Sequence, residues 1–197
     1  MPHILVYSHR LSGCTTFSKI DLVRAYQQIP VHPDFIQKTA IITPFGLFEF
    51  PFMSFRLRNA AQTFQRFIDD VLKELDLCFA YLDDILVFSH SPNEHERHLR
   101  TLFTRLQTYG ILFNHSKCVF RVSEISFLGY QISPLGSQPL AERVADLQAF
   151  PPPKTIQQLR RFLGMLNFHR RFIQTQPPLR SPYMMVFPVL KSRATIP

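Results

Sequence analysis

Apolar residues cluster around one polar pair in the stretch 79–88. Ten residues there carry eight apolar side chains, interrupted only by Asp83 and Asp84. Two short β-rich runs on either side of a polar pair predict a hairpin. Aspartate is common in turns, so the pair alone favours a solvated turn. A third carboxylate, Asp21, lies upstream in a comparable setting within 17–22, and its presence favours metal ligands at the tip of a buried hairpin.

The first part of the chain predicts strands and turns. The run 17–22 predicts a strand ending at Asp21, and 23–28 predicts a short helical turn. Prolines in 29–33 exclude a central strand, because proline cannot donate to a ladder. The runs 38–43 and 47–50 flank Pro-Phe-Gly and therefore predict a second hairpin.

Helical spacing and capping signals mark four helices. Apolar residues in 59–75 recur at helical spacing. Ser91, Pro92 and Glu94 form a helix start with a capping box, and Gly110 ends that helix. Residues 140–150 are amphipathic and end at three prolines. A second capping box at 155–158 opens the last predicted helix.

Three short apolar runs predict further strands. They are 111–113, 118–120 and 125–132, and the last contains Gly129. A glycine inside a strand marks either a bulge or the close approach of another backbone. Both interpretations remain open at this point.

Composition favours a folded, nucleic-acid-binding protein of 197 residues. The chain is 46% hydrophobic, which is enough for a core, and its net charge of +8 suits a polyanionic partner. Its three cysteines include no CxxC pair, so neither a zinc site nor a set of disulfides is expected. A reducing compartment, cytoplasm or nucleus, is therefore the expected location. No apolar run approaches 18 residues and no signal peptide is evident, so no membrane association is expected.

Two motifs give the chain a family resemblance. Tyr81-Leu82-Asp83-Asp84 resembles the Tyr-x-Asp-Asp box of reverse transcriptases, and 17–29 is similar to the first catalytic motif of these enzymes. The run from 17 to 173 resembles the pol polyprotein of gypsy-type LTR retrotransposons. The resemblance implies an α+β fold: a palm with helices on one face of an antiparallel sheet, partial fingers and the start of a helical thumb.

The same resemblance implies domain boundaries. Relatives carry more of the fingers before this stretch, and connection and ribonuclease H domains after it, so we expect truncation at both ends. The expected parts are a remnant of the fingers entry segment (1–16), palm (17–28 and 60–139), partial fingers (29–59), the start of the thumb (140–173) and a divergent, poorly ordered tail (174–197).

Nucleotidyl transfer by this family implies two Mg2+ ions about 4 Å apart, with Mn2+ as an alternative. Mg2+ takes hard oxygen ligands and needs few protein carboxylates when substrate phosphates contribute. The resemblance implies that Asp21 and Asp83 bridge the metals and that Asp84 supports them. The backbone carbonyl of Leu22 is expected to add a ligand.

The resemblance also implies a nucleotide site. Tyr26 matches the residue that selects against a ribose 2′-hydroxyl, with a core tyrosine as the alternative. Lys117 matches a lysine that can protonate the leaving pyrophosphate, with a surface lysine as the alternative. Phe55 and Leu57 are expected to line the site, whereas Arg56 stands where relatives usually have glycine and puts activity in doubt.

Two further segments imply contact with a template–primer duplex. Phe127, Leu128 and Gly129 resemble the primer grip, although a bulge explains the glycine equally well. The helix from 156 to 173 resembles the start of the thumb and carries local positive charge; the alternative is a solvated basic face. Its expected nucleic-acid contacts are Arg160, Arg161, Arg170 and Arg171.

The predicted function is RNA-directed DNA polymerisation, with dNTPs added to a primer on an RNA or DNA template. The alternative is a truncated, catalytically inactive retroelement remnant that at most binds nucleic acid. A response-regulator-like metal-binding fold would need alternating strands and helices. The predicted hairpins argue against that third class.

Overall fold

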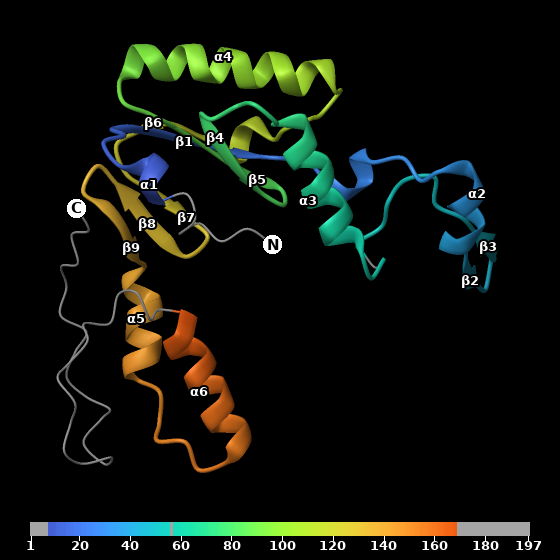
Figure 1. Cartoon of the computed structure of the whole chain (residues 1–197). Coiled ribbons are helices and arrows are strands. Elements are labelled where there is room, and N and C mark those ends of the chain that lie inside the picture. The colour runs from blue at the N-terminus through green and yellow to red at the C-terminus, as the bar shows by residue number, and fades with distance from the viewer. Residues whose placement is uncertain (1–7, 56, 169–197) are drawn as a thin grey trace. The chain divides into compact units, whose positions relative to one another are not determined.

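The computed structural model describes residues 8–55 and 57–168 of the chain (Figure 1). It divides into two compact units, Met1–Ile125 and Ser126–Pro197, and we describe each by itself. The predicted tail and residues Arg56, Arg170 and Arg171 lie outside the described residues.

A four-stranded antiparallel sheet forms the centre of the first unit. Its strand order is β4-β5-β1-β6, where β1 is Thr16–Asp21, β4 is Cys78–Tyr81, β5 is Asp84–Ser89 and β6 is Val119–Val122. The pairing of β1 with β5 sets Ile20 opposite Ile85 and Asp21 opposite Asp84. Side chains alternate between faces along a strand, so the isoleucines and the aspartates point to opposite faces.

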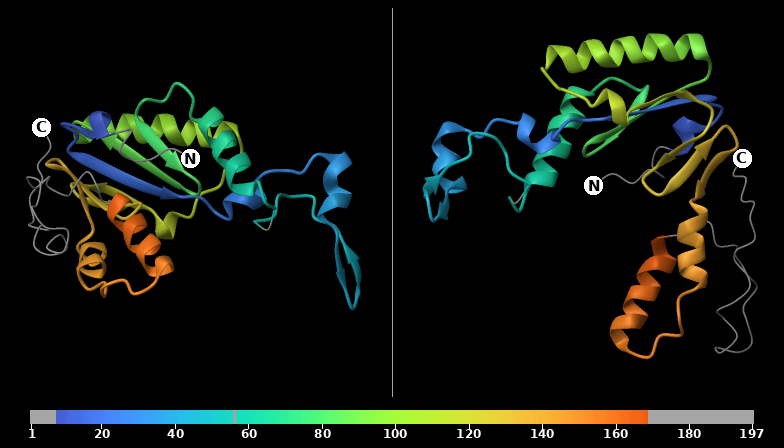
Figure 2. Two further views of the ribbon diagram at one scale, coloured as in Figure 1. Left: turned by 60° about the horizontal axis from the view of Figure 1, so that its bottom comes forward. Right: turned by 180° about the vertical axis from the view of Figure 1, so that it is seen from behind.

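Helices α3 (Ala60–Val71) and α4 (Pro92–Thr108) pack on the face of the sheet that carries Ile20 and Ile85 (Figure 2). The predicted Ser91 cap of α4 is confirmed, because its side chain accepts a hydrogen bond from the Glu94 N–H over 3.3 Å. Helix-face residues meet the sheet in one hydrophobic core, which is the palm arrangement that the sequence predicts. The helix residues buried there include Phe64, Ile68, Val71, Leu102 and Leu106.

A buried polar chain fastens α4 to the sheet. The His95 ring is fully buried, with Nε2 2.7 Å from Ser18 Oγ and Nδ1 2.8 Å from Ser89 Oγ. The backbone N–H of Arg121 also donates to Ser18 Oγ over 3.0 Å. Each ring nitrogen therefore has a hydroxyl partner, so a neutral ring can donate from one nitrogen and accept at the other. Burial is the main cause that lowers the pKa of His95 to about 4, and the positive charges of His98 and Arg121 lower it further. The low pKa agrees with a neutral ring at neutral pH.

Short elements complete the first unit. Strands β2 (Ile41–Thr43) and β3 (Gly46–Phe48) form the second predicted hairpin, which is confirmed. Most of its apolar side chains are exposed; Ile42 is 89% and Phe45 91% exposed. The remaining elements are α1 (Ser8–Leu11), η2 (Ala25–Gln28), α2 (Pro33–Ile36), η3 (Gln37–Thr39) and η4 (His115–Lys117).

The described residues of the second unit form a small sheet and two helices. Strands β7 (Ile125–Phe127, which starts at the last residue of the first unit), β8 (Tyr130–Ser133) and β9 (Gly136–Pro139) are neighbours in that order. Helices α5 (Ala141–Gln148) and α6 (Ile156–Phe168) follow, and Phe150 stacks on Phe162 with ring centroids 5.4 Å apart. The predicted Thr155 cap at the start of α6 is confirmed, because the Gln158 N–H donates to Thr155 Oγ1 over 3.2 Å; the Gln158 side chain accepts from the Lys154 N–H instead of the Thr155 N–H.

Three local predictions are wrong. The stretch 125–132 is not one strand, because Leu128 and Gly129 have φ of 50° and 85° and turn the chain between β7 and β8. The run 111–113 makes only an isolated bridge between Leu22 and Phe113. The turn between β4 and β5 is Leu82-Asp83, so Asp84 already belongs to β5.

The predicted domain boundaries remain predictions. The division between the two units falls at 125/126, inside the predicted palm segment 60–139. Within the described ranges, no helix is both long and apolar enough to cross a membrane.

Candidate active site

The three predicted aspartates occupy adjacent backbone positions at one end of the central sheet. Tyr81 and Asp84 face each other across the turn Leu82-Asp83, and Asp21 lies directly opposite Asp84 on the next strand. Directly opposite residues of antiparallel strands have Cα atoms about 4.5–5.5 Å apart. The backbone N–H of Leu22 donates to the Asp83 carbonyl oxygen over 2.8 Å and ties the end of β1 to the turn.

A second set of hydrogen bonds fixes the backbone beyond Asp21. The Asn114 N–H donates to the Asp21 carbonyl oxygen over 2.7 Å. The Gln28 side chain accepts from the Leu112 N–H at 2.7 Å and donates to the Leu112 carbonyl oxygen at 2.9 Å. These contacts hold the segment that precedes Lys117 against the end of β1.

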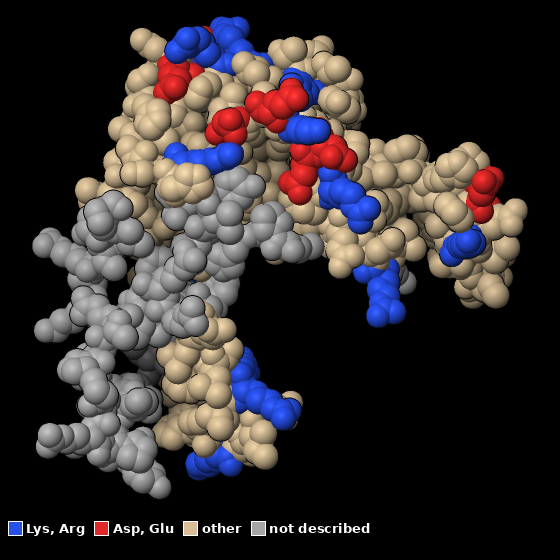
Figure 3. Space-filling model, viewed as in Figure 1, with Lys and Arg blue, Asp and Glu red and all other residues tan. Residues whose placement is uncertain are grey.

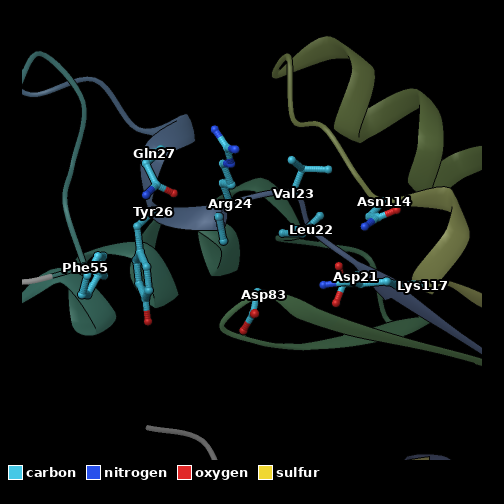
Figure 4. Close-up of a pocket in the computed structure, with 11 residues that line it drawn as sticks. Asp21, Leu22, Val23, Arg24, Tyr26, Gln27, Phe55, Asp83, Asn114 and Lys117 are labelled. Carbon is cyan, nitrogen blue, oxygen red and sulfur yellow. The ribbon is translucent and has the colours of Figure 1, made fainter.

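Asp21 and Asp83 share a pocket. Figure 4 shows Tyr26 and Phe55 toward one end of it and Lys117 and Asn114 toward the other, with Asp83 between them. Asp84 does not line the pocket. The lining residues are Asp21, Leu22, Val23, Arg24, Ala25, Tyr26, Gln27, Phe55, Asp83, Asn114 and Lys117.

The carboxylates affect the titration of their neighbours. Burial raises the pKa of Asp84; the charges of Asp83 and Asp21 add to this rise, while Lys19 opposes it. Burial also raises the pKa of Tyr26, and the charge of Asp83 contributes. The pocket lining itself carries two carboxylates, Asp21 and Asp83, and two cationic side chains, Arg24 and Lys117.

The pocket residues fit a magnesium ion only in part. In the described part of the chain, no group of three or more His, Cys, Asp or Glu side chains could hold a metal by itself. Of the three predicted carboxylates, Asp21 and Asp83 line the pocket and Asp84 does not. Two carboxylates suit Mg2+, which commonly completes its shell with water and substrate phosphates.

Of the other residues predicted for the nucleotide site, some line the pocket and one packs against the core. Tyr26 lines the pocket and contacts Phe64 edge to face, with centroids 5.6 Å apart. Phe55 also lines the pocket and is 65% exposed. Leu57 is partly buried against the core instead, and Lys117 is exposed at the pocket. Their predicted roles remain predictions.

The predicted nucleic-acid contacts belong to the second unit. Phe127 is buried, so the turn Leu128-Gly129 is the more accessible part of the predicted primer grip. Arg160 and Arg161 are exposed on α6, and Figure 3 shows basic side chains gathered there. Their contact with nucleic acid remains a prediction.

The sequence analysis missed several residues at the site. Gln65 is buried in α3 and contacts the turn Leu82-Asp83. Arg24 lines the pocket with its backbone in the left-handed region (φ 44°), and Asn114 holds Asp21. A glutamine on the apolar face of a predicted helix was the one available signal, since buried polar groups need partners.

Comparison with known proteins agrees with this geometry. Residues 3–132 match the family described as reverse transcriptase (RNA-dependent DNA polymerase). The chain is 35% identical over 175 residues to the retrovirus-related Pol polyprotein from transposon 297 of Drosophila melanogaster, covering 88% of this chain and 16% of that protein. It is also 35% identical over 175 residues to the Tf2-3 transposon polyprotein of Schizosaccharomyces pombe, covering 88% and 13%.

Solved structures give the same result. The foamy viral protease-reverse transcriptase dRH in complex with double-stranded DNA superposes with a TM-score of 0.79 at 25% identity, covering 88% of this chain and 31% of that one. The foamy viral protease-reverse transcriptase in complex with RNA/DNA hybrid gives 0.69 at 26% identity, covering 81% and 22%.

The fold and the paired aspartates define a palm of the polymerase class. The chain belongs to the reverse transcriptase family, and its curated relatives are retrotransposon Pol polyproteins.

Proposed function

We propose that this chain catalyses the addition of dNTPs to a primer in a retrotransposon reverse transcriptase. The observation that carries the proposal is that Asp21 and Asp83, from separate segments, line one pocket together with Tyr26 and Lys117. The chain spans only 16% of the length of the transposon 297 polyprotein, so the proposal concerns this part alone.

Asp21 and Asp83 are the residues that would hold magnesium, with the Leu22 carbonyl as a further oxygen ligand. When bound, two such ions activate a hydroxyl nucleophile and neutralise phosphate charge. Asp84 is half-buried outside the pocket, so we assign it the supporting role of keeping negative charge behind the site.

The remaining side chains orient the substrate. The Tyr26 ring, held by Phe64, forms a wall that would clash with a ribose 2′-hydroxyl and so favour dNTPs. Lys117 Nζ would donate a proton to the leaving pyrophosphate. The foamy viral proteins named above are complexed with double-stranded DNA and RNA/DNA hybrid, which supports a template–primer duplex as the partner.

A second candidate is a catalytically inactive remnant that only binds nucleic acid. Arg56 favours it, because the family resemblance implies a glycine there, and glycine lets other groups approach the backbone closely. The three free cysteines support a reducing cellular compartment under either candidate.

Primer extension on a primed RNA template with Mg2+ tests the proposal. The full chain should extend the primer, and Asp83→Asn should reduce extension to background while duplex binding persists. The matched control is Asp76→Asn, at an aspartate whose side chain is 85% exposed and pairs with Arg10. Binding without any extension by the native chain would favour the remnant.

A further inference from the structure

Gln65 connects helix α3 to the turn that carries Asp83. Its Oε1 accepts a hydrogen bond from the Leu82 N–H over 2.9 Å. Its Nε2 donates to the Ala80 carbonyl oxygen at 3.1 Å and to Asp69 Oδ1 at 2.9 Å. The Gln65 side chain is buried, with 5% of the residue exposed, so these partners replace water.

The orientation of the amide is fixed by its partners. The Leu82 N–H can only donate and the Ala80 carbonyl can only accept, so oxygen must face Leu82 and nitrogen must face Ala80. Both amide protons are used, one by Ala80 and one by Asp69. The side chain therefore bridges the last part of β4 and the first residue of the turn in one geometry.

The turn needs such support because Leu82 is strained. Its φ of 52° lies in the left-handed region, which disfavours residues with a Cβ atom. Leu82 is the first residue of a two-residue turn and Asp83 is the second. A change in the backbone at Leu82 would therefore re-aim the Asp83 carboxylate.

We propose that Gln65 is a positioning residue of the active site, which holds the Leu82-Asp83 turn so that the Asp83 carboxylate faces the pocket. The inference rests on the proposed function for the part that concerns metal binding. The local part, that Gln65 fixes the turn, stands on the hydrogen bonds alone.

The test uses the full chain and two readouts. The first is hydrogen exchange of the Leu82 amide, and the second is binding of Mn2+ measured by electron paramagnetic resonance. Gln65→Leu keeps the side-chain size and removes all three hydrogen bonds. Gln65→Glu keeps an acceptor for Leu82 but cannot donate to Ala80 or Asp69 at neutral pH, and it guards against a folding failure of the first variant.

The matched control is Gln107→Leu, the same change at an exposed position of α4. For Gln65→Leu we expect exchange at Leu82 to accelerate, and the affinity for Mn2+ to fall, each by about tenfold, as for loss of one buried hydrogen bond. For Gln65→Glu both effects should have the same direction, because the Ala80 carbonyl oxygen and the Asp69 carboxylate repel the new carboxylate and so weaken its hold on the Leu82 N–H. The control should match the native chain.

Two results would overturn the inference. One is unchanged Leu82 exchange in a folded Gln65→Leu or Gln65→Glu protein. The other is unchanged Mn2+ affinity in these variants when Asp83→Asn weakens it. Equal Mn2+ binding by the native chain and Asp83→Asn would instead overturn the proposed metal site, and Leu82 exchange would still decide the role of Gln65 in the turn.

Discussion

The Leu22 N–H and the Asp83 carbonyl oxygen, 2.8 Å apart, join the end of β1 to the tip of the Tyr81–Asp84 hairpin. The bond joins two backbone groups, so all carboxylate oxygens of Asp21 and Asp83 remain available to other partners. Asp21 precedes Leu22 directly, and therefore the two pocket carboxylates are held by one backbone contact. Any movement of the hairpin tip relative to β1 would change the spacing of Asp21 and Asp83.

The buried His95 predicts a loss of stability in acid. Its pKa is about 4 in the folded chain and about 6.5 when unfolded, so protonation favours the unfolded state. The contribution is fully present above pH 6.5 and is lost as the pH falls toward 4. We expect His95 to lower the free energy of unfolding by about 2–3 kcal/mol between pH 7.5 and pH 4.5, as measured by urea denaturation.

His95→Gln is the comparison that isolates this effect from the acidic residues. It should be less stable than the native chain at pH 7.5, because Ser18 and Ser89 lose their ring partner, and its stability should depend less on pH. His115→Gln, at an exposed position, should keep the native pH dependence. An unchanged pH dependence in His95→Gln would contradict the prediction.

Two glycines should respond oppositely to alanine. Gly129 has φ of 85°, and a Cβ atom there would lie 3.3 Å from Arg143 Nε. Gly129→Ala should therefore lower the free energy of unfolding by about 1–2 kcal/mol. Gly164 lies within α6, and a methyl group added there would meet nothing within 4 Å, so Gly164→Ala should raise it by about 0.5–1 kcal/mol. Thermal denaturation of the two variants measures the change in the free energy of unfolding for each. Changes of the same sign and size would refute the assignment of the Leu128-Gly129 turn.

The arginines of α6 predict a salt-dependent affinity for an RNA–DNA duplex. Binding that releases counterions gives a slope of log affinity against log salt of about −0.9 for each neutralised phosphate. Replacing Arg160 and Arg161 by glutamine should make the slope shallower by up to about 2. The matched control replaces Arg97 and Arg100, which are exposed on α4. If the slope changes only in the control, the duplex contacts α4 and not Arg160 and Arg161 on α6.

Arg56 predicts a defect in nucleotide binding. Because the family resemblance implies a glycine at this position, a long cationic side chain is expected to crowd the nucleotide. Arg56→Gly should lower the KM for dNTP in primer extension, with Arg58→Gly as the control at an exposed neighbour. A rise in KM would mean that Arg56 contributes a favourable contact to the triphosphate.

Local signals explain why much of the fold was predictable. The Ser91 and Thr155 caps depend on residues within one helical turn, so their motifs suffice. The β2–β3 hairpin has its turn signal in its own sequence. The turn Leu82-Asp83 was missed because leucine with positive φ carries no local signal; Gln65, which supports it, comes from another element. The same reason hid the turn at Leu128.

The sequence by itself determined the family, the helical and strand periodicity, and the chemical identity of the three aspartates, because motifs and hydrophobic spacing are local properties of the chain. Only the tertiary structure decided which carboxylates share a pocket. Asp21 and Asp83 enter it, whereas Asp84 pairs opposite Asp21 and stays half-buried. That outcome depends on strand register and on the long-range bonds from Leu22 and Gln65 to the turn, which no local pattern specifies.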